Sequence, residues 1–165
     1  MRILGIDPGL HICGYAVLEN DRNQLSLVEA GIFKTDRKKD MPLRLNQIAV
    51  DISSILEKFK PDIAAVEELY SHYQHPRTSI LMGHARGVIL QRCAEAGIEV
   101  KSFAATKIKK AITGNGRATK IQMQRTIQAL LSLAEMPEPD DVADAIAATL
   151  CCVNSINEDI IISGR

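Results

Sequence analysis

The sequence has no long apolar run and no excess of charge of either sign. None of its hydrophobic stretches approaches the ~18 residues of a membrane-spanning helix. The apolar run at the N-terminus is too short for a signal peptide and meets Asp7 at once. Basic and acidic residues each number 20, which excludes a globally basic nucleic-acid-binding protein but not a locally basic one. We therefore expect a cytoplasmic protein.

Cysteine is scarce, and no two cysteines have the spacing of a metal-binding pair. The four cysteines form no C-x-x-C motif and stand among apolar neighbours: Cys13, Cys93, Cys151 and Cys152. This setting favours buried thiols over metal ligands.

Internal repeats, low-complexity tracts and linkers are absent as well. The length of 165 residues and the hydrophobic content of 46% are typical of one globular domain. We expect a single domain over residues 1–156 and a flexible tail at residues 157–165.

Charge is unevenly distributed along the second half of the chain. Between Val100 and Ala134 there are seven basic residues and no acidic one. From Glu135 onward there are seven acidic residues, and Arg165 is the one base. A site that holds both phosphates and cations would have this pattern, and so would two solvated helix faces of opposite sign.

Hydrophobic periodicity predicts a protein of the α/β class. Three strands come first and resemble an antiparallel meander, and the later strands alternate with helices, which requires parallel crossovers. We expect a mixed five-stranded sheet flanked by helices. The predicted strands are Arg2–Asp7, Cys13–Leu18, Leu25–Phe33, Ile63–Val66 and Glu99–Phe103. The predicted helices are Pro42–Lys58, Thr78–Ala96, Thr106–Ile112, Thr119–Leu133 and a last one from about Asp141 to Val153.

Two carboxylates stand where predicted strands end. Asp7 follows Arg2–Ile6, and Glu67 follows Ile63–Val66. A buried carboxylate needs a metal ion, a basic partner or solvent. If the two strands are parallel neighbours, both side chains point into one crevice at their carboxyl ends, whereas Glu68 faces the other side of its strand. The alternatives are an Asx-type turn at Asp7 and a solvated strand end at Glu67.

Two further carboxylates share one face of the last predicted helix. Asp141 and Asp144 stand three residues apart, away from the apolar stripe of that helix. The alternative is helix capping by Asp140 or Asp141, which does not account for three aspartates within five residues. Four carboxylates without a His or Cys set suit Mg²⁺ or Mn²⁺. Two such ions can activate a water and stabilise the leaving oxygen in phosphodiester cleavage.

Four segments resemble, in the same order, the RuvC family of Holliday-junction resolvases. They are Ile3–Gly9, Ala65–Glu67, Met82–Gly87 and Asp141–Ala147. The resemblance implies an RNase H-like fold, a homodimer and a two-metal nuclease that nicks two strands of a four-way DNA junction at preferred sequences. It also implies the RuvA–RuvB branch-migration machinery as a partner.

The same resemblance assigns roles to individual residues. The catalytic and metal-binding acids would be Asp7, Glu67, Asp141 and Asp144, with Mg²⁺ as the cofactor. The DNA-contacting lysines would be Lys109 and Lys120. Tyr70 stands where the family usually has a phenylalanine that stacks on bases, and tyrosine can stack as well.

A glycine-containing loop lies between these two lysines. Gly114 and Gly116 precede a predicted helix start, where backbone N–H groups can face a DNA phosphate. The alternative is a helix C-cap flanked by surface lysines.

Three other functions compete with this interpretation. An actin-like kinase or ATPase shares the first motif, but it needs a second domain that 165 residues cannot supply. A related RNase H-like nuclease that acts on another DNA or RNA substrate is the nearer alternative. A non-enzymatic junction binder is the third, and the intact acids at all four positions argue against it.

Overall fold

The computed structural model describes residues 1–22, 24–69 and 76–163. Within these residues a five-stranded sheet has the order β3-β2-β1-β4-β5. The first three strands pair antiparallel, while β1–β4 and β4–β5 pair parallel, which confirms the mixed sheet. The strands are β1 (Arg2–Asp7), β2 (Ile12–Asp21), β3 (Gln24–Lys34), β4 (Ile63–Glu67) and β5 (Glu99–Phe103).

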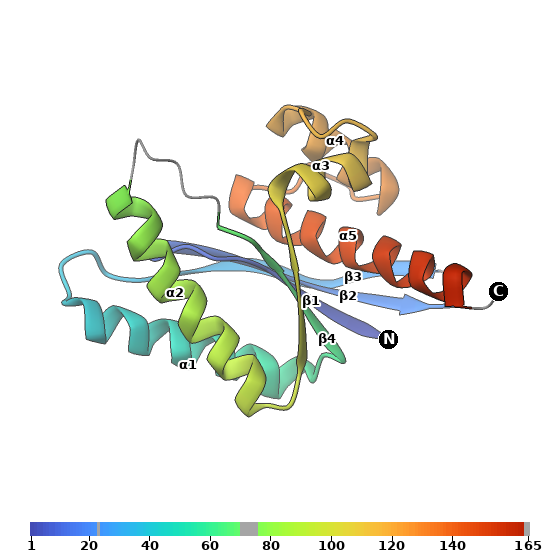
Figure 1. Cartoon of the computed structure of the whole chain (residues 1–165). Coiled ribbons are helices and arrows are strands. Elements are labelled where there is room, and N and C mark those ends of the chain that lie inside the picture. The colour runs from blue at the N-terminus through green and yellow to red at the C-terminus, as the bar shows by residue number, and fades with distance from the viewer. Residues whose placement is uncertain (23, 70–75, 164–165) are drawn as a thin grey trace.

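Helices cover both faces of this sheet. Figure 1 shows α1 and α2 on one side, and α5 with α3 and α4 on the other. The described helices are α1 (Met41–Phe59), α2 (Pro76–Glu95), α3 (Ala105–Thr113), α4 (Lys120–Leu130) and α5 (Asp140–Ser163). None of them is both long and apolar enough to cross a membrane, among the residues that the structure describes.

Strand β1 is buried on both faces, because its successive side chains point to opposite sides and each side meets a layer of helices. In β1, Leu4 and Ile6 pack with α1 and α2. Ile3 belongs to the other core, with Ala145 and Ile146 of α5. All five side chains are fully buried. The continuous apolar run before Asp7 therefore reflects a central strand between two helical layers.

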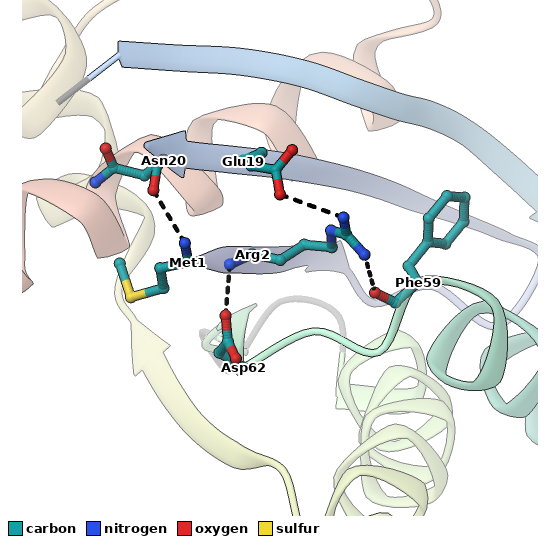
Figure 2. Close-up of polar contacts among 6 residues, drawn as sticks. All are labelled: Met1, Arg2, Glu19, Asn20, Phe59 and Asp62. Atoms are coloured by element: carbon teal, nitrogen blue, oxygen red, sulfur yellow. Dashed lines mark hydrogen bonds and ion pairs between the residues drawn. The ribbon is translucent and has the colours of Figure 1, made fainter. Parts of the chain in front are cut away.

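Hydrogen bonds fix the start of β1 (Figure 2). The Arg2 guanidinium donates to the Phe59 carbonyl at 2.7 Å and to the Glu19 carboxylate at 3.2 Å, and the Arg2 backbone N–H donates to Asp62 at 2.6 Å. The terminal ammonium of Met1 donates to the backbone carbonyl of Asn20 at 3.0 Å. These bonds join β1 to β2 and to the α1–β4 connection, so they help to set where the opposite end of β1 lies.

The last two helices differ from their predicted bounds. Helix α4 ends at Leu130, not Leu133, because Ser132 adopts a left-handed backbone (φ 51°) and the Leu133 N–H donates back to Gln128. Such a left-handed residue commonly ends a helix.

Helix α5 continues to Ser163, well beyond the predicted end at Val153. Contacts support the extension: Asn154 donates to the Ala111 carbonyl, and Lys101 pairs with Asp159, both at 3.3 Å. The boundary at residue 156 thus falls inside one helix, and the flexibility of residues 157–165 stays a prediction.

Candidate active site

The carboxyl ends of β1 and β4 place two acids side by side at one edge of the sheet. The strands are parallel neighbours, with Ile3 opposite Ile63 and Ile6 opposite Val66. The next residues along these strands are Asp7 and Glu67, each at the last position of its strand. The condition under which Asp7 and Glu67 share one edge, parallel pairing of these two strands, is therefore met.

Helix α5 brings two more acids over the same edge because glycines let it touch the sheet. A β-carbon at Gly5 would lie 2.2 Å from the Ala145 carbonyl oxygen, and one at Gly14 would lie 1.9 Å from the Asp141 carbonyl oxygen. Real β-carbons do not approach so closely, so both strand positions require glycine. The first turns of α5, with Asp141 and Asp144, therefore rest directly on β1 and β2.

Burial and the charges of neighbouring acids raise the pKa of three carboxyl groups at this edge, those of Asp7, Glu67 and Asp144. Burial, followed by the charges of Glu67, Asp144 and Asp141, raises the pKa of Asp7 to about 8. Burial and the charge of Asp144 raise the pKa of Glu67 to about 7. The pKa of Asp144 is raised as well, mainly by burial. The structure thus brings the four predicted acids into one electrostatically coupled cluster (Asp7, Glu67, Asp141 and Asp144), the carboxylate cluster below.

The donor set of this cluster fits hard divalent cations. All its potential donor atoms are carboxylate oxygens, which Mg²⁺ and Mn²⁺ prefer. A bound cation would offset the repulsion that raises the pKa of Asp7 and Glu67. In the part of the chain described, no three Asp, Glu, His or Cys side chains are already arranged as a metal cage. The acids would therefore have to draw closer around an ion.

Two lysines lie beside the carboxylate cluster. Helices α3 and α4 contribute Lys109 and Lys120 to a pocket of about 120 Å³ that Glu67 and Asp144 also line. Both ammonium groups counteract the rise in the pKa of Glu67 and Asp144. Lys120 also lowers the pKa of Asp7. The two lysines singled out in the sequence therefore lie at the acidic site, and their contact with DNA stays a prediction.

The loop between the two lysines uses several of its N–H groups internally. Gly114 has a left-handed backbone (φ 75°) and donates to the Lys110 carbonyl, so it caps α3. The Arg117 N–H donates to the Asn115 side chain at 2.9 Å. A β-carbon at Gly116 would lie 3.2 Å from the Thr106 carbonyl oxygen, so this glycine allows a close approach to α3. Both glycines have packing or capping roles, and phosphate binding by this loop stays a prediction.

Three further residues, whose roles the sequence alone did not predict, also shape the site. Gly5 and Gly14 admit α5, and their signal was a glycine inside each of two apolar strands. Arg86, within the segment Met82–Gly87, donates to the Glu67 carbonyl at 3.2 Å and to the Ser102 hydroxyl at 2.7 Å. It therefore holds the ends of β4 and β5 together from α2.

Glu68, the neighbour of Glu67 in the sequence, stands apart from the cluster. Glu68 is exposed, and its backbone N–H donates to the Phe103 carbonyl at 2.9 Å. Its charge is not among the causes that raise the pKa of Asp7 or Glu67. Tyr70, the predicted stacking residue, lies outside the described residues.

The strand order, the helices on both faces and the carboxylates from β1, β4 and α5 define a class of protein. They are the arrangement of an RNase H-like nuclease, the fold that the resemblance to the RuvC family implied. A family model described as "Crossover junction endodeoxyribonuclease RuvC" matches residues 3–152. The chain belongs to this family, whose members are metal-dependent endodeoxyribonucleases.

Individual relatives agree with this assignment. The chain is 50% identical over 149 residues to the RuvC of Rhodopirellula baltica, covering 90% of this chain and 84% of the relative. It is 42% identical over 156 residues to the RuvC of Heliobacterium modesticaldum, covering 94% and 96%.

Solved structures of Thermus thermophilus RuvC are similar along nearly the whole chain. The RuvC structure on its own matches with a TM-score of 0.88 at 28% identity, covering 96% of this chain and 97% of the other. The same protein in complex with its Holliday junction substrate matches with a TM-score of 0.90 at 28% identity, covering 96% of both chains.

Proposed function

We propose that this protein resolves four-way (Holliday) DNA junctions by paired, metal-dependent nicks during homologous recombination and DNA repair. The observation that carries the proposal is the convergence of four carboxylates at one sheet edge, beside two lysines. Similarity to Thermus thermophilus RuvC, whose structure was solved with a Holliday junction substrate, supports the same substrate here.

Asp7, Glu67, Asp141 and Asp144 would hold two Mg²⁺ ions in each active site, and Mn²⁺ can substitute. The metals would supply an activated water and stabilise the charge on the leaving oxygen of the cut phosphodiester. The chain's own part is to fix the donors. Gly5 and Gly14 hold α5 against the sheet, and Arg86 holds the backbone of Glu67. Each carboxylate would then be offered to the metals from a strand or helix rather than from a loop.

DNA would lie across the basic rim of the carboxylate cluster. Lys109 and Lys120 would contact DNA phosphates near the cut, because both line the pocket that Glu67 and Asp144 also line. Gly114 and Gly116 shape the loop between them and would let the DNA backbone approach. Tyr70 follows Glu67 by three residues and would stack on a base at the mouth of the site.

Resolution of a junction requires two cuts, one in each of two strands. A homodimer supplies two active sites, so we propose that the functional unit is a homodimer acting in the cytoplasm. The RuvA–RuvB branch-migration complex would be its partner. These assignments rest on membership in the family.

A nicking assay tests the proposal. Purified protein is incubated with a mobile four-way junction, with the matching linear duplex and with an RNA–DNA hybrid, in Mg²⁺, in Mn²⁺ and in EDTA. We expect paired nicks in the junction with either metal and none in EDTA. Preferred cleavage of the hybrid or the duplex would favour a related nuclease with another substrate. Undiminished cleavage in EDTA would overturn the metal mechanism.

A further inference from the structure

Helix α4 and the start of α5 are joined by a small polar network beside the carboxylate cluster. The Lys120 ammonium donates to one carboxylate oxygen of Asp140 at 2.7 Å. The Gln124 amide donates to the other oxygen at 3.3 Å. Lys120 and Gln124 stand four residues apart on α4, so they share one helical face, and Asp140 is the first residue of α5.

The Gln124 amide holds Asp140 from the protein interior. Gln124 is only 8% exposed, and the same amide nitrogen donates to the Pro137 carbonyl at 3.1 Å. An amide NH₂ group has two hydrogens, so one can serve Pro137 and the other Asp140. The carboxylate of Asp140 is therefore oriented by a buried group, although Asp140 itself is near the surface.

Stability alone does not explain the ion pair between Lys120 and Asp140. Their side chains are 66% and 47% exposed, and exposed ion pairs add little to the free energy of folding. The pair differs from an ordinary surface pair in its surroundings, because Lys120 also interacts with the charges of Asp7, Glu67 and Asp144. The Lys120 ammonium thus forms an ion pair with Asp140, while the acids of the carboxylate cluster act on it through their charges.

We propose that Asp140 is a positioning residue that holds the Lys120 ammonium at the rim of the carboxylate cluster, where it meets a phosphate of the DNA to be cut. Both carboxylate oxygens of Asp140 accept hydrogen bonds from α4, one from Lys120 and one from Gln124. Since both oxygens are held by α4, Asp140 acts through Lys120. A free lysine side chain loses rotamer entropy when it binds a phosphate. Holding Lys120 in advance reduces that loss where the cut takes place. This inference rests on the proposed nuclease function.

The first test requires no activity. The metal-free, DNA-free protein is treated with a limiting amine-acylating reagent, and modification of each lysine is measured by mass spectrometry, with exposed Lys110 as the internal reference. Only the neutral amine of a lysine is acylated, and a carboxylate partner keeps the lysine protonated, so Asp140→Asn is expected to raise acylation of Lys120 roughly threefold to tenfold. Gln124→Leu is expected to raise it less. Glu138→Gln, which removes a charge two residues away, is the matched control and leaves it unchanged.

The second test separates positioning from a merely structural role. In single-turnover nicking at saturating enzyme and Mg²⁺, Asp140→Asn is expected to lower the rate roughly threefold to tenfold, a loss that weaker junction binding cannot cause at saturation. Asp140→Glu keeps the charge and restores part of the rate. Because Asp140 acts through Lys120, adding Asp140→Asn to Lys120→Ala causes no further loss.

Two results would overturn the inference: additive losses in that double variant, or unchanged acylation of Lys120 in Asp140→Asn. A wild-type protein that nicks no junction would instead refute the proposed function, while the acylation result still decides whether Asp140 holds Lys120.

Discussion

A β-carbon at Gly14 would stand 1.9 Å from the carbonyl oxygen of Asp141, and 3.1 Å from the Asp141 β-carbon. This contact between β2 and the first turn of α5 determines how closely Asp141 approaches the sheet edge. Since the neighbouring turn makes a similar contact at Gly5, the helix cannot tilt at one point without strain at the other.

We expect Gly14→Ala to damage the site and the fold together. The added methyl group must push α5 away from β2, and overpacking of this kind costs about 1–3 kcal/mol. Displacement of Asp141 is expected to reduce nicking more than it reduces junction binding. Thermal unfolding and single-turnover nicking measure the two effects. Gly87→Ala on α2 is the control, because no atom lies within 4 Å of its added β-carbon. A fully active, fully stable Gly14→Ala protein would contradict the close contact.

Loss of any one carboxylate of the cluster is expected to separate binding from chemistry. Asp7→Asn, Glu67→Gln, Asp141→Asn and Asp144→Asn each remove a metal ligand, and each is expected to reduce nicking by roughly a hundredfold or more. Junction binding is expected to persist, since removal of negative charge near phosphates does not weaken it. Gel-shift and nicking assays on the same junction measure both.

Glu68→Gln is the matched control for these four variants, because Glu68 is exposed and lies outside the cluster. It is expected to keep most activity. If Glu68→Gln were inactive and Glu67→Gln active, the assignment of the acid at the end of β4 would be wrong by one residue.

The sequence predicted the strand-end acids because two independent patterns agreed. An apolar run that ends in Asp7 and another that ends in Glu67 predict buried strands. The alternation of strands and helices after the first helix predicts parallel crossovers, and the pairing of these two strands was a condition that the structure shows to hold. Asp141 and Asp144 could be predicted for a different reason, because helical periodicity places them away from the apolar stripe of the last helix.

The roles of Gly14, Arg86 and Asp140 were not predictable in the same way. Each depends on a contact between segments far apart in the chain: Gly14 with Asp141, Arg86 with Glu67, and Asp140 with Lys120. Periodicity shows which face of an element is buried, but not which backbone atom or carboxylate it meets. The end of α5 was missed for a related reason, because contacts with Ala111 and Lys101 support the polar segment beyond Val153.

The metal-free protein is expected to lose stability as the pH rises. Asp7 and Glu67 have ordinary pKa values of 3.8 and 4.5, and in the folded protein these rise to about 8 and about 7. Between those values the folded chain binds more protons than the unfolded chain, so the free energy of unfolding falls with increasing pH. The decrease starts above the ordinary values and levels off above about pH 8.

Chemical denaturation of the metal-free protein at pH 5, 7 and 9 measures this decrease. Asp7→Asn is expected to flatten it, because the neutral amide removes the charge that must be buried at high pH. Addition of Mg²⁺ at pH 8 is expected to raise the unfolding temperature of the wild type and not of Asp7→Asn. A stability that rises between pH 5 and pH 8 would contradict the burial of these carboxyl groups.

Tyr70 offers a prediction that depends on sequence position alone. If its ring stacks on a base, Tyr70→Phe keeps cleavage, while Tyr70→Ala loses ~1–3 kcal/mol of stacking, or roughly tenfold or more in rate. Single-turnover nicking and thermal unfolding are measured together. A Tyr70→Ala protein that is destabilised yet cleaves normally when folded would indicate a packing role.

The two lysines beside the cluster are expected to contact phosphates. Each phosphate contact adds about 0.9 to the slope of log affinity against log salt, so Lys109→Ala and Lys120→Ala should each flatten that slope by about this amount. Fluorescence anisotropy of a labelled junction in EDTA measures this slope. The salt concentration is varied between 50 and 200 mM, about the range in which such contacts are sensitive. Lys58→Ala is the control, because Lys58 lies on α1 at the other face of the sheet and pairs with Glu29. Because Lys109 and Lys120 line the pocket with Glu67 and Asp144, replacing either lysine with alanine is also expected to lower the nicking rate. An unchanged slope in both variants would mean that these lysines balance the acids without touching DNA.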